Sequence, residues 1–132
     1  MKKLLIVIVL VIVTSTIFAQ DFRLRAFSST YSYANIYGEF NDLKTNEHPS
    51  NILIVITKNT ITVYAKQQTT YSIVAIESVK YDREIGPYTL TKLLDDEGIQ
   101  CIGKVYVPNE TTTYHLVIQY RNVMFIYNCK EE

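Results

Sequence analysis

Beyond residue 20, the chain consists of short strand-like runs separated by tight turns, and no apolar pattern repeats about every 3.6 residues over a useful length. Ile52–Thr57 is continuously apolar and largely β-branched, which favours a strand buried on both faces over a helix. Thr60–Lys66 alternates apolar and polar residues, and Lys58-Asn59 between the two runs is typical of a tight turn. Strands joined by such short links must be antiparallel, so the sequence predicts an all-β antiparallel meander of about seven to nine strands.

A meander of this length can bury its apolar face in two ways. It can close into a small barrel or strongly rolled sheet, or it can fold over into a two-sheet β-sandwich. Because barrel closure removes exposed edge strands, we expect the barrel or rolled sheet, with the sandwich as the alternative. The chain is long enough for one modest core, so we expect a single all-β domain over residues 20–132.

The N-terminus has the layout of a secretory signal peptide. Residues 1–3 are a short basic segment, Leu4–Val13 is an unbroken apolar run, and a more mixed segment ends at the small residue Ala19. We predict cleavage after Ala19, which makes residues 1–19 a leader and the mature protein secreted or periplasmic. An uncleaved anchor is the alternative, but Leu4–Ala19 is shorter than the run of about 20 apolar residues that spans a bilayer. No stable membrane span is expected after leader removal.

The charge balance bears on partners. The chain has 13 basic and 13 acidic side chains, and loss of Lys2 and Lys3 with the leader leaves a slight acidic excess. Phosphate binding depends on clustered Lys and Arg, and the sequence has no basic cluster. Nucleic acid is therefore not an expected partner.

Arg23 and Arg25 alternate with the apolar residues of the segment Asp21–Phe27. A period of two predicts a half-buried strand on which both arginines point to the same, solvent-exposed face. An exposed, solubilising face is the simplest interpretation, on a strand that could lie at an edge and be protected there by its charges, and an anion site is the alternative.

The ribbon Leu90–Cys129 contains the clearest hairpin signal. Asp95-Asp96-Glu97-Gly98 has good turn chemistry, because Asp accepts hydrogen bonds from the backbone two residues on and Gly adopts the positive φ of a turn. Tyr114–Tyr127 reads as one long strand whose side-chain parity switches at Arg121-Asn122. We expect a β-bulge there, with a two-residue hairpin turn as the alternative, because the usual turn glycine is lacking.

Cys101 and Cys129 are candidate disulfide partners, since an exported protein can be oxidised. If Val107 faces Tyr114, Cys101 lies opposite Tyr120, and a straight last strand places Cys129 about 30 Å further along. A disulfide needs Cα atoms within about 7 Å. The bond therefore requires the last strand to bend sharply or to cross to another sheet, and a buried Cys101 with a free terminal Cys129 is the alternative.

Few residues suggest catalysis. His48 and His115 are the only histidines, and the sequence lacks a Gly-x-Ser-x-Gly nucleophile elbow. The acidic run Asp95–Glu97 could serve glycoside hydrolysis or bind calcium, but a solvated turn explains it more simply. We therefore predict no catalytic residues, no metal site and no cofactor.

The chain contains eleven tyrosines and no tryptophan. Tyrosine suits half-buried sheets, and it is also favoured at interfaces, so the cluster Tyr31, Tyr33 and Tyr37 is the candidate binding face. We expect a small secreted, non-enzymatic β-domain that binds a protein, a glycan or a small apolar ligand. A small secreted hydrolase that uses carboxylate and histidine chemistry is one alternative, and a structural envelope component is another.

Overall fold

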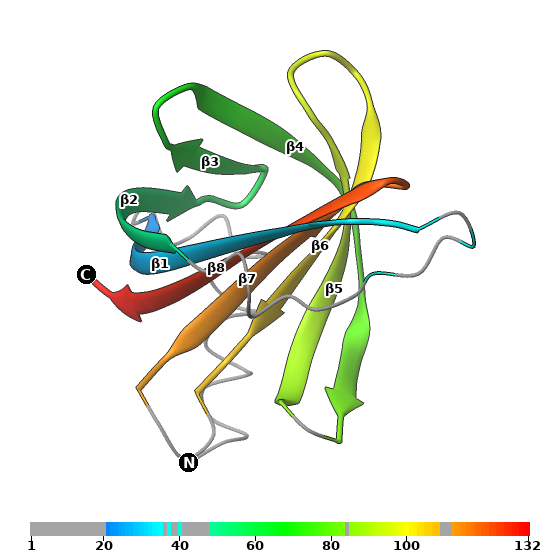
Figure 1. Cartoon of the computed structure of the whole chain (residues 1–132). Helices are drawn as coiled ribbons and strands as arrows, with labels where there is room; N and C mark the ends of the chain where they lie inside the picture. The colour runs from blue at the N-terminus through cyan, green and yellow to red at the C-terminus, as the bar shows by residue number, and fades with distance from the viewer. Residues whose placement is uncertain (1–20, 36, 38–39, 41–47, 84, 109–111) are drawn as a thin grey trace.

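The computed structural model describes residues 21–35, 37, 40, 48–83, 85–108 and 112–132, and its strands form a closed barrel (Figure 1). Each strand pairs antiparallel with its neighbours in sequence, and β8 pairs back onto β1. This confirms the predicted all-β barrel, and the sandwich alternative is not formed. The eight named strands are β1 (Phe22–Tyr33), β2 (His48–Ile56), β3 (Thr60–Tyr64), β4 (Gln68–Asp82), β5 (Gly86–Leu94), β6 (Gln100–Tyr106), β7 (Tyr114–Gln119) and β8 (Val123–Glu131).

Inward-pointing apolar side chains fill the barrel. Leu24, Leu116 and Ile118 are completely buried within this core. Packing is tight at Gly103 on β6, where a Cβ atom would lie 2.7 Å from both Leu93 Cδ1 and Thr91 Oγ1. Glycine at this position therefore leaves room for the inward side chains of β5.

β1 is an internal strand of the barrel, because it pairs with β2 on one side and with β8 on the other. The suggested edge position of this strand is therefore wrong. β1 also continues beyond Phe27 to Tyr33, through a register shift between Ala26 and Ser28. Likewise β2 begins at His48, although the segment His48–Asn51 is rich in residues typical of loops, and residues 41–47 lie outside the described part. Pairing with neighbouring strands here overrides weak local β-propensity.

The expected bulge at Arg121-Asn122 is wrong, and the hairpin alternative is correct. β7 ends at Gln119, β8 starts at Val123, and the Tyr120 backbone N–H donates to the Val123 carbonyl at 2.8 Å. Residues that face each other across a hairpin share a face of the sheet, and Ile118 pairs with Phe125. This pairing produces the switch in side-chain parity that suggested a bulge.

Both cysteines are free and buried, so the candidate disulfide is not formed. Ile102 pairs with Gln119, as the predicted register requires, which places Cys101 beside the β7–β8 turn. Cys129 pairs instead with Tyr114 at the other end of β7. The separation along the strands is about 20 Å, far beyond the reach of a disulfide. The structure matches the alternative, a buried Cys101 with a free Cys129, and Cys129 is itself completely buried.

The predicted leader, residues 1–19, lies outside the described residues. In the part of the chain that is described, no helix is long and apolar enough to cross a membrane.

Candidate functional site

The two ends of the barrel differ in what they carry. We call one end the cavity end: it holds the β3–β4, β5–β6 and β7–β8 turns and the end of β1 at Tyr33. We call the other the terminal end: it holds the start of β1 at Phe22, the β2–β3 and β4–β5 turns, and Glu132. The names follow from the alternating direction of the strands, which Figure 1 shows.

A cavity of about 550 Å³, partly open to solvent, lies at the cavity end. Its volume falls within the range of about 300–1,000 Å³ that is usual for small-molecule sites. Its apolar lining includes Phe40, Val74, Leu94 and Ile102. Val74 is exposed because the register shift between Ile73 and Ala75 leaves it without a partner on β5.

Part of the cavity lining is a row of paired residues across three strands. Lys92 on β5 pairs with Ile102 on β6, and Ile102 pairs with Gln119 on β7. Arg121 lies in the β7–β8 turn just beyond this row. Gln100 lies two residues before Ile102 on β6. Among the described residues, the lining therefore combines an apolar wall with two side-chain amides and two cations, and includes no carboxylate.

Asp95 fixes the rim of the cavity. Its Oδ1 accepts hydrogen bonds from the backbone N–H groups of Glu97 at 3.0 Å and Ile99 at 2.8 Å. Its Oδ2 accepts a hydrogen bond from the Tyr120 hydroxyl at 2.9 Å, which ties the β5–β6 turn to the β7–β8 turn. Gly98 has a φ of 81°, as the turn chemistry predicted. The acidic run therefore acts as a turn, and among the described residues no group of three or more His, Cys, Asp or Glu side chains could hold a metal ion.

Burial and hydrogen bonding shift the pKa values of groups at this rim. Burial raises the pKa of the Cys101 thiol to about 11, against a smaller opposing effect of its hydrogen bond with Tyr120. Burial, followed by hydrogen bonds with Tyr71 and Asp95, also raises the pKa of Tyr120. For Asp95, burial acts to raise the pKa, but the bonds from Ile99, Tyr120 and Glu97 together outweigh it and lower the pKa. Asp95 is thus held as a carboxylate beside neutral thiol and phenol groups.

The predicted tyrosine face is only partly assembled. Tyr31 and Tyr33 lie on β1 with ring centroids 5.7 Å apart, and Tyr31 also stacks on His48 at 6.3 Å. Tyr37 is 79% exposed and lies beyond the end of β1. None of the three lines the cavity. The tyrosine face stays a prediction.

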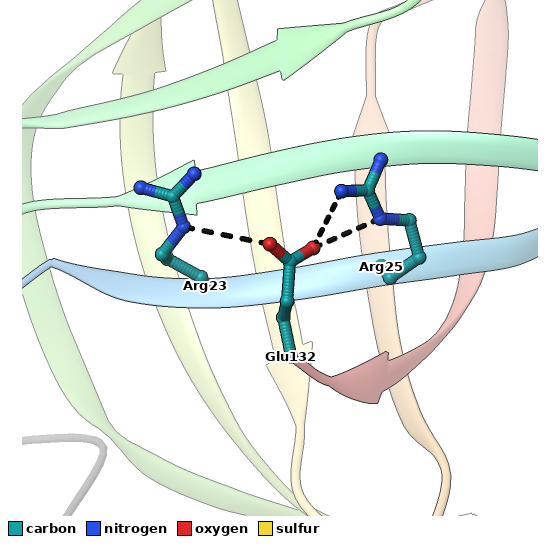
Figure 2. A network of polar contacts seen from close by, with 3 residues as sticks. All are labelled: Arg23, Arg25 and Glu132. Carbon is teal, nitrogen blue, oxygen red and sulfur yellow. Dashed lines mark hydrogen bonds and ion pairs between the residues drawn. The ribbon is translucent and has the colours of Figure 1, made fainter.

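Arg23 and Arg25 lie at the terminal end, where the carboxylate of Glu132 lies between them (Figure 2). Arg25 Nη2 is 2.7 Å and Arg23 Nε is 3.8 Å from the carboxylate oxygens of Glu132. The Glu132 backbone N–H also donates to the Arg23 carbonyl at 3.1 Å. The two arginines therefore share a face as predicted, and the anion beside them belongs to the chain itself.

His115 belongs to a row of side chains on the outside of the barrel. Its Nδ1 lies 2.7 Å from Asn128 Oδ1, and Asn128 Nδ2 donates to Ser28 Oγ at 2.8 Å. On its other side, its ring makes an edge contact with Tyr106, whose ring in turn lies 4.7 Å from that of Tyr88. Pairing across β5, β6, β7, β8 and β1 generates this row, which locks strand register.

Sequence reasoning missed the cavity residues Lys92, Ile102, Gln119 and Arg121. The turn at Asp95–Gly98 already implies that Lys92 lies opposite Ile102, so part of the row could have been found. No family model, no curated protein and no solved structure matches the chain. The class that the fold and the site define is a small closed antiparallel barrel with a cavity at one end.

Proposed function

We propose that this protein is a non-enzymatic binding module that holds a small, largely apolar molecule in the cavity at one end of its barrel. The observation that carries the proposal is the cavity itself, of about 550 Å³ and walled by Val74, Leu94 and Ile102. Sites for small molecules are concave and mostly apolar, with polar groups that fix orientation, and this cavity joins an apolar wall to polar side chains at its edge. The predicted leader, residues 1–19, supports a secreted or periplasmic location for this binding.

The hydrolase alternative receives less support from the same geometry. His115 contacts Asn128 and Tyr106, and His48 stacks on Tyr31. Among the described residues, no carboxylate lies within hydrogen-bonding distance of either histidine. A general base needs a third group to orient it, so the binding proposal explains more of the molecule. No specific observation favours a structural envelope component over a binding module.

The test is a fluorescence titration with N-phenyl-1-naphthylamine, a neutral apolar probe whose emission rises in apolar surroundings. We expect saturable binding at one site in the wild-type protein. Ile102→Thr removes apolar surface from the cavity wall while keeping a β-branched residue on β6. Loss of about 1 kcal/mol of apolar contact should weaken probe binding about fivefold.

Ile85→Thr is the matched control, because Ile85 is similarly exposed and lies in the β4–β5 turn at the terminal end. This variant should bind the probe as the wild type does. Absence of saturable binding, or equal weakening by both substitutions, would contradict the proposed site.

A further inference from the structure

We propose that the cavity selects ligands that carry one anionic group on an apolar body, as a small organic acid does, with Arg121 and Lys92 as the residues that recognise the charge. This inference rests on the proposed function and names the ligand class of the same site. Its basis is the composition of the lining, in which the described residues include two cationic side chains and no carboxylate.

The two cations flank the apolar wall. Lys92 projects from β5 and Arg121 from the β7–β8 turn, and Ile102 on β6 lies between these elements. A molecule with its apolar part against Ile102 would therefore have a cation on each side. The amides of Gln100 and Gln119 add hydrogen-bond donors to the same lining. Guanidinium groups bind oxyanions through two parallel hydrogen bonds, which favours carboxylate, sulfonate and phosphate groups.

The acidic residues near the cavity do not neutralise both cations. Lys92 Nζ lies 3.5 Å from Glu77 Oε1, but both side chains are well exposed and the pair is weak. Within the described ranges, no ion pair to Arg121 is recorded. The Asp95 carboxylate is already engaged by Tyr120 and by two backbone N–H groups. Arg121 is thus the cation best placed to meet an anionic ligand.

A pair of probes isolates the contribution of charge. 1-Anilinonaphthalene-8-sulfonate carries the same two aromatic groups as N-phenyl-1-naphthylamine and adds one sulfonate. We expect the wild-type protein to bind the sulfonate probe more tightly than the neutral probe at low salt. Arg121→Gln and Lys92→Gln should each weaken sulfonate binding about threefold, and the double variant about tenfold, and each should weaken neutral-probe binding less than sulfonate binding.

Lys58→Gln is the matched control, because Lys58 is an exposed lysine in the β2–β3 turn at the terminal end. It should leave the affinity for both probes unchanged. The advantage of the sulfonate probe should also shrink in about 0.5 M salt, because exposed charges are screened. Far-UV circular dichroism of each variant checks that the barrel is intact.

Each outcome decides between the two proposals. Saturable binding of both probes with equal affinity, or equal effects of Arg121→Gln and Lys58→Gln, would overturn the anionic ligand class and leave the binding module standing. Binding of neither probe would overturn the proposed function and this inference together. Tighter sulfonate binding that depends on Arg121 and Lys92 supports both.

Discussion

The two ends of the barrel use charge in different ways. At the cavity end, the carboxylate of Asp95 accepts three hydrogen bonds. Two come from backbone N–H groups of its own turn, and the third comes from the partly buried Tyr120 hydroxyl. At the terminal end, the carboxylate of Glu132 lies between two exposed arginines. The first arrangement joins two turns, and the second joins the last residue to β1 (Figure 2).

The comparison indicates which of these contacts stabilise the fold more, the hydrogen bonds of Asp95 or the ion pairs of Glu132. Hydrogen bonds to a charged group contribute about 1.5–3 kcal/mol each, and less where they are exposed, as the two backbone bonds to Asp95 are, whereas the Tyr120 bond is partly buried. Exposed ion pairs contribute about 0–1 kcal/mol. Asp95 therefore should hold the rim of the cavity firmly. The Arg23–Glu132–Arg25 contact should add little beyond the backbone pairing of β1 with β8.

The largest expected contrast between the ends is in thiol reactivity. Cys101 lines the cavity, whereas Cys129 is completely buried beside Tyr114. Burial raises the pKa of Cys101 to about 11 and that of Cys129 to about 12, so both react slowly. We expect a small maleimide to label Cys101 about 100-fold faster, which corresponds to about 2.7 kcal/mol less opening free energy.

Peptide mass spectrometry during native labelling measures the two rates. Denaturation should then expose both thiols, because the structure holds them as free cysteines. Equal native rates would remove the contrast between the ends. Failure to label either cysteine in the denatured, unreduced protein would show that the two are bonded after all.

Removal of Asp95 should give the next largest effect. Asp95→Ala deletes the acceptor for Glu97, Ile99 and Tyr120, and we expect a loss of about 2–3 kcal/mol of unfolding free energy. Urea unfolding followed by circular dichroism measures it. Asp96→Ala is the matched control, since Asp96 is exposed in the same turn, and it should cost less than about 0.5 kcal/mol. A similar cost for both variants would mean that the Asp95 bonds do not hold the rim.

Acid should weaken the same rim. The pKa of Asp95 is lowered in the folded state from its ordinary value of 3.8, so its carboxylate stabilises the fold above that value. This contribution is lost as pH falls through the lowered pKa, when the folded-state carboxylate takes up its proton. Urea midpoints between pH 6 and acid should therefore fall less steeply in Asp95→Asn than in the wild type. Identical pH profiles would contradict the assigned role.

The smallest expected effect is at the terminal end. Glu132→Gln removes the charge between Arg23 and Arg25 and should cost about 0.5 kcal/mol at low salt. The cost should disappear in about 1 M salt, because both partners are exposed and screened. Urea unfolding at the two salt concentrations measures it. A loss comparable to that of Asp95→Ala would abolish the proposed difference between the ends.

Local chemistry explains which parts of this fold could be predicted. The Asp95–Gly98 turn, the Lys58-Asn59 turn and the β6–β7 register follow from residues close in sequence, and the structure confirms them. The turn at Arg121-Asn122 was assigned wrongly, because a hairpin and a bulge produce the same parity switch and no glycine decides between them.

The cavity could not be predicted for a different reason. It depends on the register shift that exposes Val74 and on Phe40 meeting strands far along the chain. β1 likewise extends to Tyr33 because β8 pairs with it. The polar sequence from Ser28 to Tyr33 does not by itself predict a strand. Contacts between distant segments determine these features, and local propensity carries little information about them.

The most direct test of the account is to map the binding of N-phenyl-1-naphthylamine by amide chemical shifts in the ¹⁵N-labelled protein. We predict that the largest shifts fall on Lys92–Leu94, Gln100–Ile102 and Gln119–Arg121, which line the cavity. Amides around Arg23 and Glu132 at the terminal end should not move. Shifts centred on the terminal end, or spread evenly over the barrel, would contradict a binding site at the cavity end.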